Sequence, residues 1–173
     1  MKLAYVMTDT RGETDLLLSQ FAAALLGRGT RLAGVVQTNT PCADHRLCDM
    51  DVQVLPDGPV FRISQSLGAQ SRGCRLDPAA LEEAVGLVSV SLDQVPDLLV
   101  VNKFGKHEAD GRGFRPVIAE ALARDIPVVA GVNMLNHDVF VEFSGGIAKR
   151  LPATDEALED WFARVVAPQQ QSA

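Results

Sequence analysis

Short apolar runs that alternate with longer amphipathic segments limit most strongly how this chain can fold. Runs at residues 3–7, 32–36, 97–101 and 127–132 are rich in Val, Leu and Ala and end in polar loops, which is typical of strands buried on both faces of a sheet. Between the first two runs, residues 16–28 place apolar side chains at helical spacing. This alternation predicts a mostly parallel sheet connected by crossover helices.

The remaining segments extend the pattern into a doubly wound order. Apolar residues at 52–55 and 60–63 flank a Pro-Asp-Gly-Pro turn, which predicts a β-hairpin. Asp77-Pro78 and Thr154 each precede an apolar-faced segment and are typical helix starts. Further elements are predicted as helices at 77–93, 116–124 and 136–143 and as an edge strand at 147–151.

We therefore predict one α/β domain, a doubly wound three-layer sandwich with one β-hairpin. It spans residues 1–167 and is followed by a frayed tail at 168–173. A chain of 173 residues can build one sizeable core, and a second core would be cramped. In such sheets ligands bind at the carboxyl ends of the strands, so site residues are expected in the loops that follow the strands.

The charge balance and the cysteine content restrict the partners and the compartment. A formal net charge of −6 argues against a nucleic-acid binder, which needs a basic face to contact phosphates. The sequence contains no apolar run long enough for a bilayer span or a signal-peptide core. Its three cysteines make no disulfide framework. We expect a cytoplasmic protein without membrane insertion or nucleic-acid binding, with a small anion as partner and a homo-oligomer left open.

The loop at 102–113 concentrates charge at the expected ligand-binding edge. Basic side chains gather there, and Gly111 and Gly113 let backbone amides approach a ligand. This pattern indicates a site for a small anion, and a solvated charged loop is the alternative. The predicted ligand-binding residues are Lys103, Lys106, Arg112, Arg75, Arg72, Gly105, Gly111, Gly113, Gln37 and Asn102, with Asn39 as a further neutral donor.

Two further groups of residues suggest other chemistry. Cys42, His45 and Cys48, with Cys74 on a later loop, are of the types that bind zinc or another soft metal, although free thiols are the simpler interpretation. His107 with Glu108 or Asp110 forms a pair suited to general acid–base catalysis. A charged surface histidine beside acidic residues is the simpler interpretation of that pair.

Several motifs resemble those of known families. The segment 97–108 (DLLVVNKFGKHE) resembles the second acidic motif of small bacterial and archaeal P-loop nucleoside triphosphatases related to MobB. More closely, the chain resembles a bacterial family of unknown function encoded beside molybdate ABC transporters. The motifs that carry this resemblance are Val36-Gln37, Cys48, GCRLD at 73–77, NKFGKHE at 102–108 and GRG at 111–113. This resemblance implies a P-loop-like fold and a link to molybdenum, but it implies no particular reaction.

The phosphate-binding loop departs from the P-loop pattern. In Gly-x4-Gly-Lys-[Ser/Thr] the amides wrap the phosphates, the lysine neutralises them and the hydroxyl binds Mg²⁺. Residues 8–15 stand in that place, with Thr8 and Glu13 at the glycine positions, Thr14 at the lysine and Asp15 at the hydroxyl. Carboxylates where a triphosphate would lie repel it. We therefore expect no conventional binding of Mg-ATP.

The second motif departs as well, because Asn102 and Lys103 replace the Asp-Glu pair that would hold Mg²⁺ and activate water. We interpret the chain as a non-hydrolytic accessory protein that holds molybdate, tungstate or a phosphate-containing molecule, with molybdenum transport or cofactor-assembly proteins as partners. Two alternatives remain. One is a divergent nucleotide hydrolase or transferase with Glu108 as base, and the other is a metal-delivery protein that uses Cys48 and Cys74.

Overall fold

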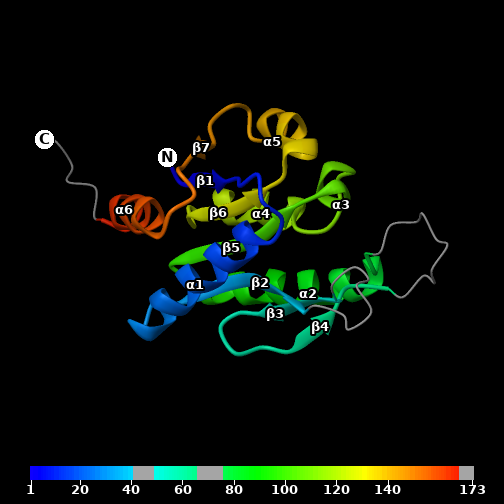
Figure 1. Cartoon of the computed structure of the whole chain (residues 1–173). Helices are drawn as coiled ribbons and strands as arrows, with labels where there is room; N and C mark the ends of the chain where they lie inside the picture. Colours follow the sequence, from blue (N-terminus) through cyan, green and yellow to red (C-terminus); the bar gives the residue numbers. More distant parts are fainter. Residues whose placement is uncertain (41–48, 66–75, 168–173) are drawn as a thin grey trace, which may run out of the picture.

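The computed structural model describes residues 1–40, 49–65 and 76–167. Over these residues the chain forms a seven-stranded sheet in the order β4-β3-β2-β5-β6-β1-β7, with helices on both faces (Figure 1). Neighbouring strands from β2 to β7 in this order are parallel. The strands are β1 Leu3–Val6, β2 Leu32–Thr40, β3 Asp49–Val54, β4 Val60–Arg62, β5 Leu98–Phe104, β6 Val128–Val132 and β7 Lys149–Arg150.

Strands β3 and β4 form the antiparallel end of the sheet and confirm the predicted hairpin. Strand β3 also pairs antiparallel with β2, from Val35 opposite Val54 to Thr40 opposite Asp49. This pairing carries β2 to Thr40, so the prediction that a loop begins at Gln37 is wrong. Gln37 and Asn39 are therefore placed by backbone pairing rather than by a loop.

The helices cover both faces of the sheet and confirm the predicted three-layer sandwich (Figure 1). Buried side chains on one face include Leu18, Phe21 and Trp161, and those on the other include Leu81 and Phe140. The first face is covered by α1 Glu13–Gly27 and α6 Asp155–Val166. The second is covered by α2 Pro78–Ser91, α4 Arg115–Ala123 and α5 His137–Phe143. Single-turn elements are η1 Leu92–Gln94, α3 Lys106–Ala109 and η2 Met134–Asn136.

Side-chain caps start two helices where the sequence predicts them. The Asp77 carboxylate accepts the backbone N–H groups of Ala79 and Ala80 at 3.0 and 3.2 Å, and the Thr154 hydroxyl accepts that of Ala157 at 3.2 Å. Helix α1 instead begins at Glu13, earlier than the predicted residue 16, after Gly12 with a left-handed φ of 86°.

The end of β5 also differs from the prediction. The strand continues to Phe104, which pairs with Val132 after a register shift that begins at Val101. The predicted loop at 102–113 is therefore wrong in its first part, and α3 follows it directly. Irregularities of this kind redirect side chains at a strand end. Here Asn102 and Phe104 stay buried while Lys103 is exposed.

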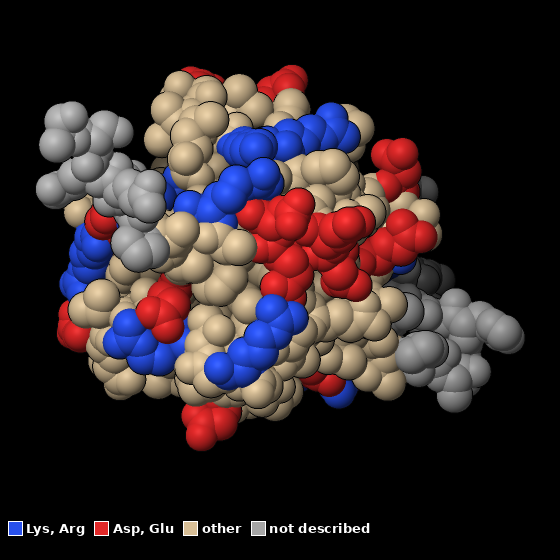
Figure 2. Space-filling model, turned by 90° about the vertical axis from the view of Figure 1, so that its left-hand side faces the viewer, with Lys and Arg blue, Asp and Glu red and all other residues tan. Residues whose placement is uncertain are grey.

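The opposite edge of the sheet, where the strands begin, carries mixed charge. Figure 2 faces this side and shows acidic side chains in a contiguous patch bordered by basic ones. Ion pairs at this edge include Arg31 with Asp97 at 2.6 Å and Arg28 with Glu159 at 2.7 Å. The Arg31 guanidinium donates hydrogen bonds to Asp97 and holds the pKa of that carboxyl below its ordinary value.

Within the three described ranges, no helix combines the length and apolar character that a bilayer span requires. The tail predicted to fray, 168–173, lies outside the described residues.

Candidate functional site at the carboxyl edge of the sheet

A cavity of about 480 Å³ lies at the carboxyl edge of the sheet, on the side covered by α2. This volume is in the range of small-molecule sites, roughly 300–1,000 Å³. Its apolar wall includes Val35, Val52, Ile63, Leu81 and Phe114. Its polar lining includes Gln37, Asn102, Lys103, Lys106 and Arg112. The cavity thus brings together predicted ligand-binding residues from β2, β5 and the segment around α3.

A second hollow, of about 750 Å³, lies between α2 and α4 and shares Pro78, His107 and Arg112 with this cavity. Its other lining residues are mostly small or apolar, with Glu82 and Glu120 as acids. We place the candidate site in the smaller cavity, because only that one is lined by the strand ends where such sheets bind ligands.

The basic side chains at the cavity differ in their partners. Lys103 is the exposed residue of β5 and Lys106 is the first residue of α3, and neither makes an ion pair with a described residue. Arg112 lies beyond α3, with its Nη2 atom 3.6 Å from Asp110 Oδ2. The two lysines are therefore the charges most available to a ligand.

Glu108 belongs to α3, as Lys106 does, but its side chain is only 3% exposed. Its Oε2 atom accepts the Gly105 N–H at 2.9 Å, and its Oε1 atom accepts the Phe114 N–H at 3.3 Å. Burial raises the pKa of the Glu108 carboxyl above its ordinary value. A Cβ atom at Gly113, which has a φ of 59°, would lie 2.2 Å from Glu108 Oε1. The Glu108 carboxylate therefore joins the two ends of the segment from Gly105 to Phe114.

His107 is buried as well, and the expectation of a surface histidine is wrong. Its Nε2 atom lies 2.7 Å from Glu82 Oε1 on α2, and the same oxygen accepts the Gly113 N–H at 3.0 Å. Glu82 thereby ties α2 to the turn after α3. The sequence carries no motif around Glu82, so only the structure identifies this residue.

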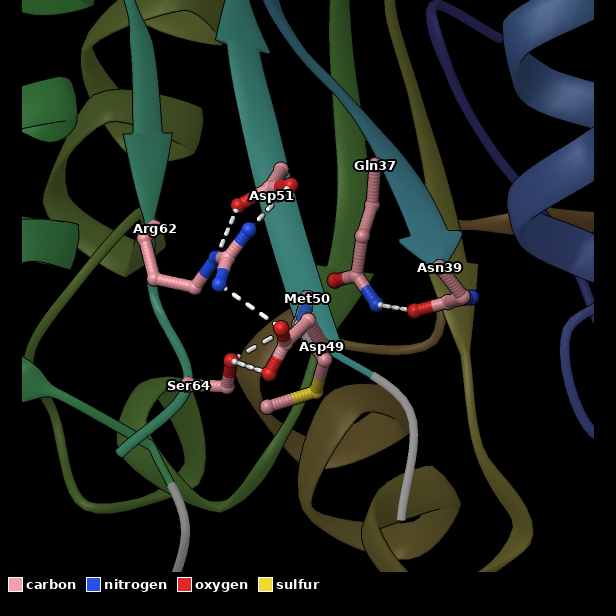
Figure 3. Close-up of polar contacts among 7 residues, drawn as sticks. All are labelled: Gln37, Asn39, Asp49, Met50, Asp51, Arg62 and Ser64. Carbon is pink, nitrogen blue, oxygen red and sulfur yellow. Dashed lines mark hydrogen bonds and ion pairs between the residues drawn. The ribbon is translucent and has the colours of Figure 1, made fainter. Parts of the chain in front are cut away.

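A buried polar network lies where β2, β5 and α1 meet. Asn102 Nδ2 donates to Asp15 Oδ1 at 2.8 Å, and Asn102 Oδ1 accepts the Gln37 N–H at 2.9 Å. Gln37 Nε2 donates to Asn39 Oδ1 at 2.7 Å (Figure 3), and Asn39 Nδ2 donates to Asp15 Oδ2. Asp15, Gln37 and Asn102 are each at least nine-tenths buried. The side-chain N–H groups of Gln37 and Asn102, expected to face a ligand, are thus directed to acceptors inside the protein.

This network contains two residues that the sequence motifs predict to stand at the Mg²⁺ positions of a P-loop protein. Asp15 is predicted at the hydroxyl position of the phosphate loop and Asn102 at the first acid of the second motif, and the Asn102 amide donates to the Asp15 carboxylate. Asp15 faces the sheet, whereas Asp9 and Glu13 are exposed. Repulsion of a triphosphate at this loop would therefore come from Asp9 and Glu13.

A second polar cluster joins the two strands of the hairpin (Figure 3). The Arg62 guanidinium donates to Asp51 Oδ1 at 2.6 Å and to Asp49 Oδ2 at 2.7 Å. Ser64 Oγ accepts the Met50 N–H at 3.1 Å. These contacts hold the end of β4 against the start of β3, next to the cavity residue Met50.

The remaining predicted site residues lie outside the described residues. These are Arg72, Arg75, Cys42, His45, Cys48 and Cys74. Within the described parts of the chain, no group of three His, Cys, Asp or Glu side chains could hold a metal ion. Gly105 and Gly111 lie at the cavity and at the neighbouring hollow, respectively.

The sheet order and the two helical layers define an α/β fold that solved proteins share. A human cancer-related nucleoside triphosphatase has this fold, with a TM-score of 0.64 and 17% identity over 100% of both chains. THEP1 from Aquifex aeolicus is similar, with a TM-score of 0.65 and 15% identity over 96% of this chain and 97% of that one. At such identities the likeness shows the fold alone.

The chain belongs to the family described as protein of unknown function DUF2478, whose model matches residues 3–161. The family resemblance predicted from the motifs is thereby confirmed. A relative is the molybdenum import ATP-binding protein ModC 2 of Bradyrhizobium diazoefficiens, 35% identical over 163 residues. The match covers 93% of this chain and 18% of that protein, so the chain spans less than a fifth of the relative's length.

Proposed function

We propose that this chain is a non-hydrolytic binding protein that holds a small anion in the 480 Å³ cavity and serves the handling of molybdenum. The contact between Asp15 and Asn102 is the observation that carries the proposal. In a P-loop protein a hydroxyl and a carboxylate present oxygen atoms to Mg²⁺ at these positions. Here the Asp15 carboxylate instead accepts a hydrogen bond from the Asn102 amide. A Mg²⁺ ion bound to a triphosphate would then find no protein ligands at these two positions.

The lining of the cavity supports an anion as the ligand. Lys103 and Lys106 reach the cavity without an acidic partner among the described residues, and Arg112 lies beside them. Of the acids that line the cavity, Asp110 lies 3.6 Å from Arg112, and Glu108 accepts the backbone N–H groups of Gly105 and Phe114. A bound anion would supply the negatively charged partner that the two lysines lack.

The link to molybdenum is supported by the relative that is a molybdenum import ATP-binding protein. Only a small share of that protein matches this chain, so its ATP-binding activity is not transferred. We propose that molybdate or tungstate, or a phosphate-containing molecule, is the anion, and that a molybdenum transport or cofactor-assembly protein is the partner.

A melting assay with a panel of ligands tests the proposal. At least one of molybdate, tungstate and an organic phosphate monoester should raise the melting temperature, whereas sulfate and Mg-ATP should not. At 100 times the dissociation constant, the stabilisation should reach about 2.7 kcal/mol. Lys103→Ala with Lys106→Ala should abolish the response, and Lys149→Ala, an exposed lysine on β7, should leave it unchanged. A panel in which no anion stabilises the protein would reject the proposal.

The hydrolase alternative requires Glu108 to act as a base. It gains support if Mg-ATP or Mg-GTP is turned over and Glu108→Gln abolishes that turnover. The backbone contacts of both Glu108 oxygens favour a structural role instead. The metal-delivery alternative rests on Cys48 and Cys74, and it predicts bound metal that is lost on Cys48→Ser or Cys74→Ser.

A further inference from the structure

We infer that the cavity takes an organic anion with an apolar body and a hydrogen-bond donor, rather than a bare oxyanion. This inference rests on the proposed function and narrows its ligand class. Three observations at the same cavity carry it: an apolar wall, an acceptor with a fixed orientation, and lysines at one side.

The apolar wall exceeds what a bare oxyanion can use. Val35, Val52 and Phe114 form the buried part of this wall and are each 2% exposed, whereas Met50 and Leu135, which line the same cavity, are more exposed. Ile63 and Leu81 add to the same wall. A tetrahedral oxyanion fills only a small part of 480 Å³, and moving its charge against apolar side chains is unfavourable. An apolar or ring-shaped body would remove this wall from water and gain free energy.

Gln37 presents an acceptor to the cavity. Its Nε2 atom is held by Asn39 Oδ1 at 2.7 Å and faces Asp15 Oδ2 at 3.5 Å, so a flipped amide would place its oxygen against a carboxylate. In Figure 3 the Gln37 oxygen points away from Asn39, toward β3 and Met50. Gln37 and Met50 both line the cavity, and no described residue donates to Gln37 Oε1. A ligand with an N–H or O–H group can donate to this oxygen.

Lys103 and Lys106 set where the anionic group lies. Both come from the end of β5 and the start of α3, whereas the apolar wall comes mainly from β2, β3 and α2. The cavity is therefore polarised: its charged groups, which include the acids Glu108 and Asp110 beside the basic residues, lie on one side and most of its hydrocarbon lies on the other. An organic phosphate, sulfonate or carboxylate has the matching arrangement of charged group and body.

A pair of dyes separates the contributions of charge and apolar surface. Anilinonaphthalene sulfonate carries an apolar body, an N–H group and a sulfonate, and phenylnaphthylamine has the same body and N–H group without the charge. Fluorescence titration of the folded protein should show one binding site for the sulfonate. Lys103→Ala with Lys106→Ala should weaken the sulfonate at least tenfold and leave phenylnaphthylamine unchanged.

Replacement of apolar lining residues should weaken both dyes. Leu135 lines the cavity and is 91% exposed, so Leu135→Ser leaves the core intact. Combined with Met50→Ser it should weaken both dyes about fivefold, which corresponds to about 1 kcal/mol. The matched controls are Lys149→Ala and Leu87→Ser, the latter an exposed α2 residue that does not line the cavity, and both should change nothing.

The outcomes distinguish this inference from the proposed function. Suppose that molybdate stabilises the protein but the sulfonate does not bind, or binds equally well to the lysine variant. That result overturns the inference and leaves the proposed function standing. Equal binding of the two dyes also overturns it, because the charge would then contribute nothing. If neither molybdate nor the sulfonate binds, both fail.

Discussion

The side-chain amide of Asn102 donates a 2.8 Å hydrogen bond to the carboxylate of Asp15, and this contact joins the end of β5 to the first turn of α1. Because both residues are buried, the pair should contribute to stability. Asn102→Asp would set two carboxylates against each other, and we expect it to lower the free energy of unfolding by about 3–5 kcal/mol at neutral pH. Urea denaturation measures this change.

The double variant Asp15→Asn with Asn102→Asp restores an amide opposite a carboxylate. It should therefore regain most of the stability that Asn102→Asp alone loses, as a double-mutant cycle would show. Asp9→Asn is the matched control, since Asp9 is exposed in the same loop, and it should stay within about 0.5 kcal/mol of the wild type. A stable Asn102→Asp single variant would contradict this account of the pair.

Gly113 and Gly145 share a backbone conformation but differ in their surroundings, because a Cβ atom at Gly113 would meet the side chains of Glu108 and His107. Both have a left-handed φ, 59° and 58°, but a Cβ atom at Gly113 would lie 2.2 Å from Glu108 Oε1, whereas one at Gly145 meets nothing within 4 Å. Gly145→Ala should lower the free energy of unfolding by about 1 kcal/mol, the backbone cost alone. Gly113→Ala should lower it by about 1–3 kcal/mol more, because the buried Glu108 must move. Equal losses in thermal or urea denaturation would show that Glu108 adjusts freely.

Glu82 should be more important to stability than its neighbour Glu83. Glu82 Oε1 contacts His107 Nε2 and accepts the Gly113 N–H, whereas Glu83 is exposed and makes no hydrogen bond to a described residue. Glu82→Ala would leave the buried His107 without its partner, and we expect a loss of about 1–3 kcal/mol. Glu83→Ala should change the free energy of unfolding by less than about 0.5 kcal/mol. Similar values for the two variants would refute this role of Glu82.

The pH dependence of stability should report the buried Glu108. Burial raises its pKa in the folded protein above the ordinary value of 4.5, so the folded state binds the proton more tightly than the unfolded state does. The resulting stabilisation is fully present below pH 4.5 and is lost as the pH rises through the raised pKa.

Glu108→Gln removes this titration, so it isolates the effect. The free energy of unfolding of the wild type, relative to that of Glu108→Gln, should fall as the pH rises above about 4.5. The lost backbone contact of the glutamine adds a constant offset, so the slope is the quantity to measure. A difference that does not change with pH would mean that Glu108 titrates alike in both states.

Much of the fold could be predicted from local sequence patterns. Apolar runs, the Pro-Asp-Gly-Pro turn and the caps at Asp77 and Thr154 each report a short-range preference, and the structure confirms the elements they predict. The ends of β2 and β5 could not be predicted in this way. They depend on the pairing of Thr40 with Asp49 and of Phe104 with Val132, which are partners distant in the sequence.

The candidate site was predicted in part. Charge and position in the sequence identified Lys103 and Lys106, which the structure places at one cavity. The roles of Glu82 and Asp15 depend on which side chains become buried next to them, and a lone acidic residue in a sequence carries no such signal. The burial of His107 could not be predicted either, because α3 is a single turn and too short to show a helical pattern of apolar residues.

Both margins of the sheet end in short strands. Strand β7 has two residues, Lys149 and Arg150, both exposed and basic, and β4 has three, with Arg62 held by Asp49 and Asp51. A strand from another molecule would find few free backbone groups there, and the two basic side chains of β7 would oppose a copy of themselves. Edge-to-edge growth into fibrils is therefore disfavoured, and copies that meet in solution would have to do so through helices or loops.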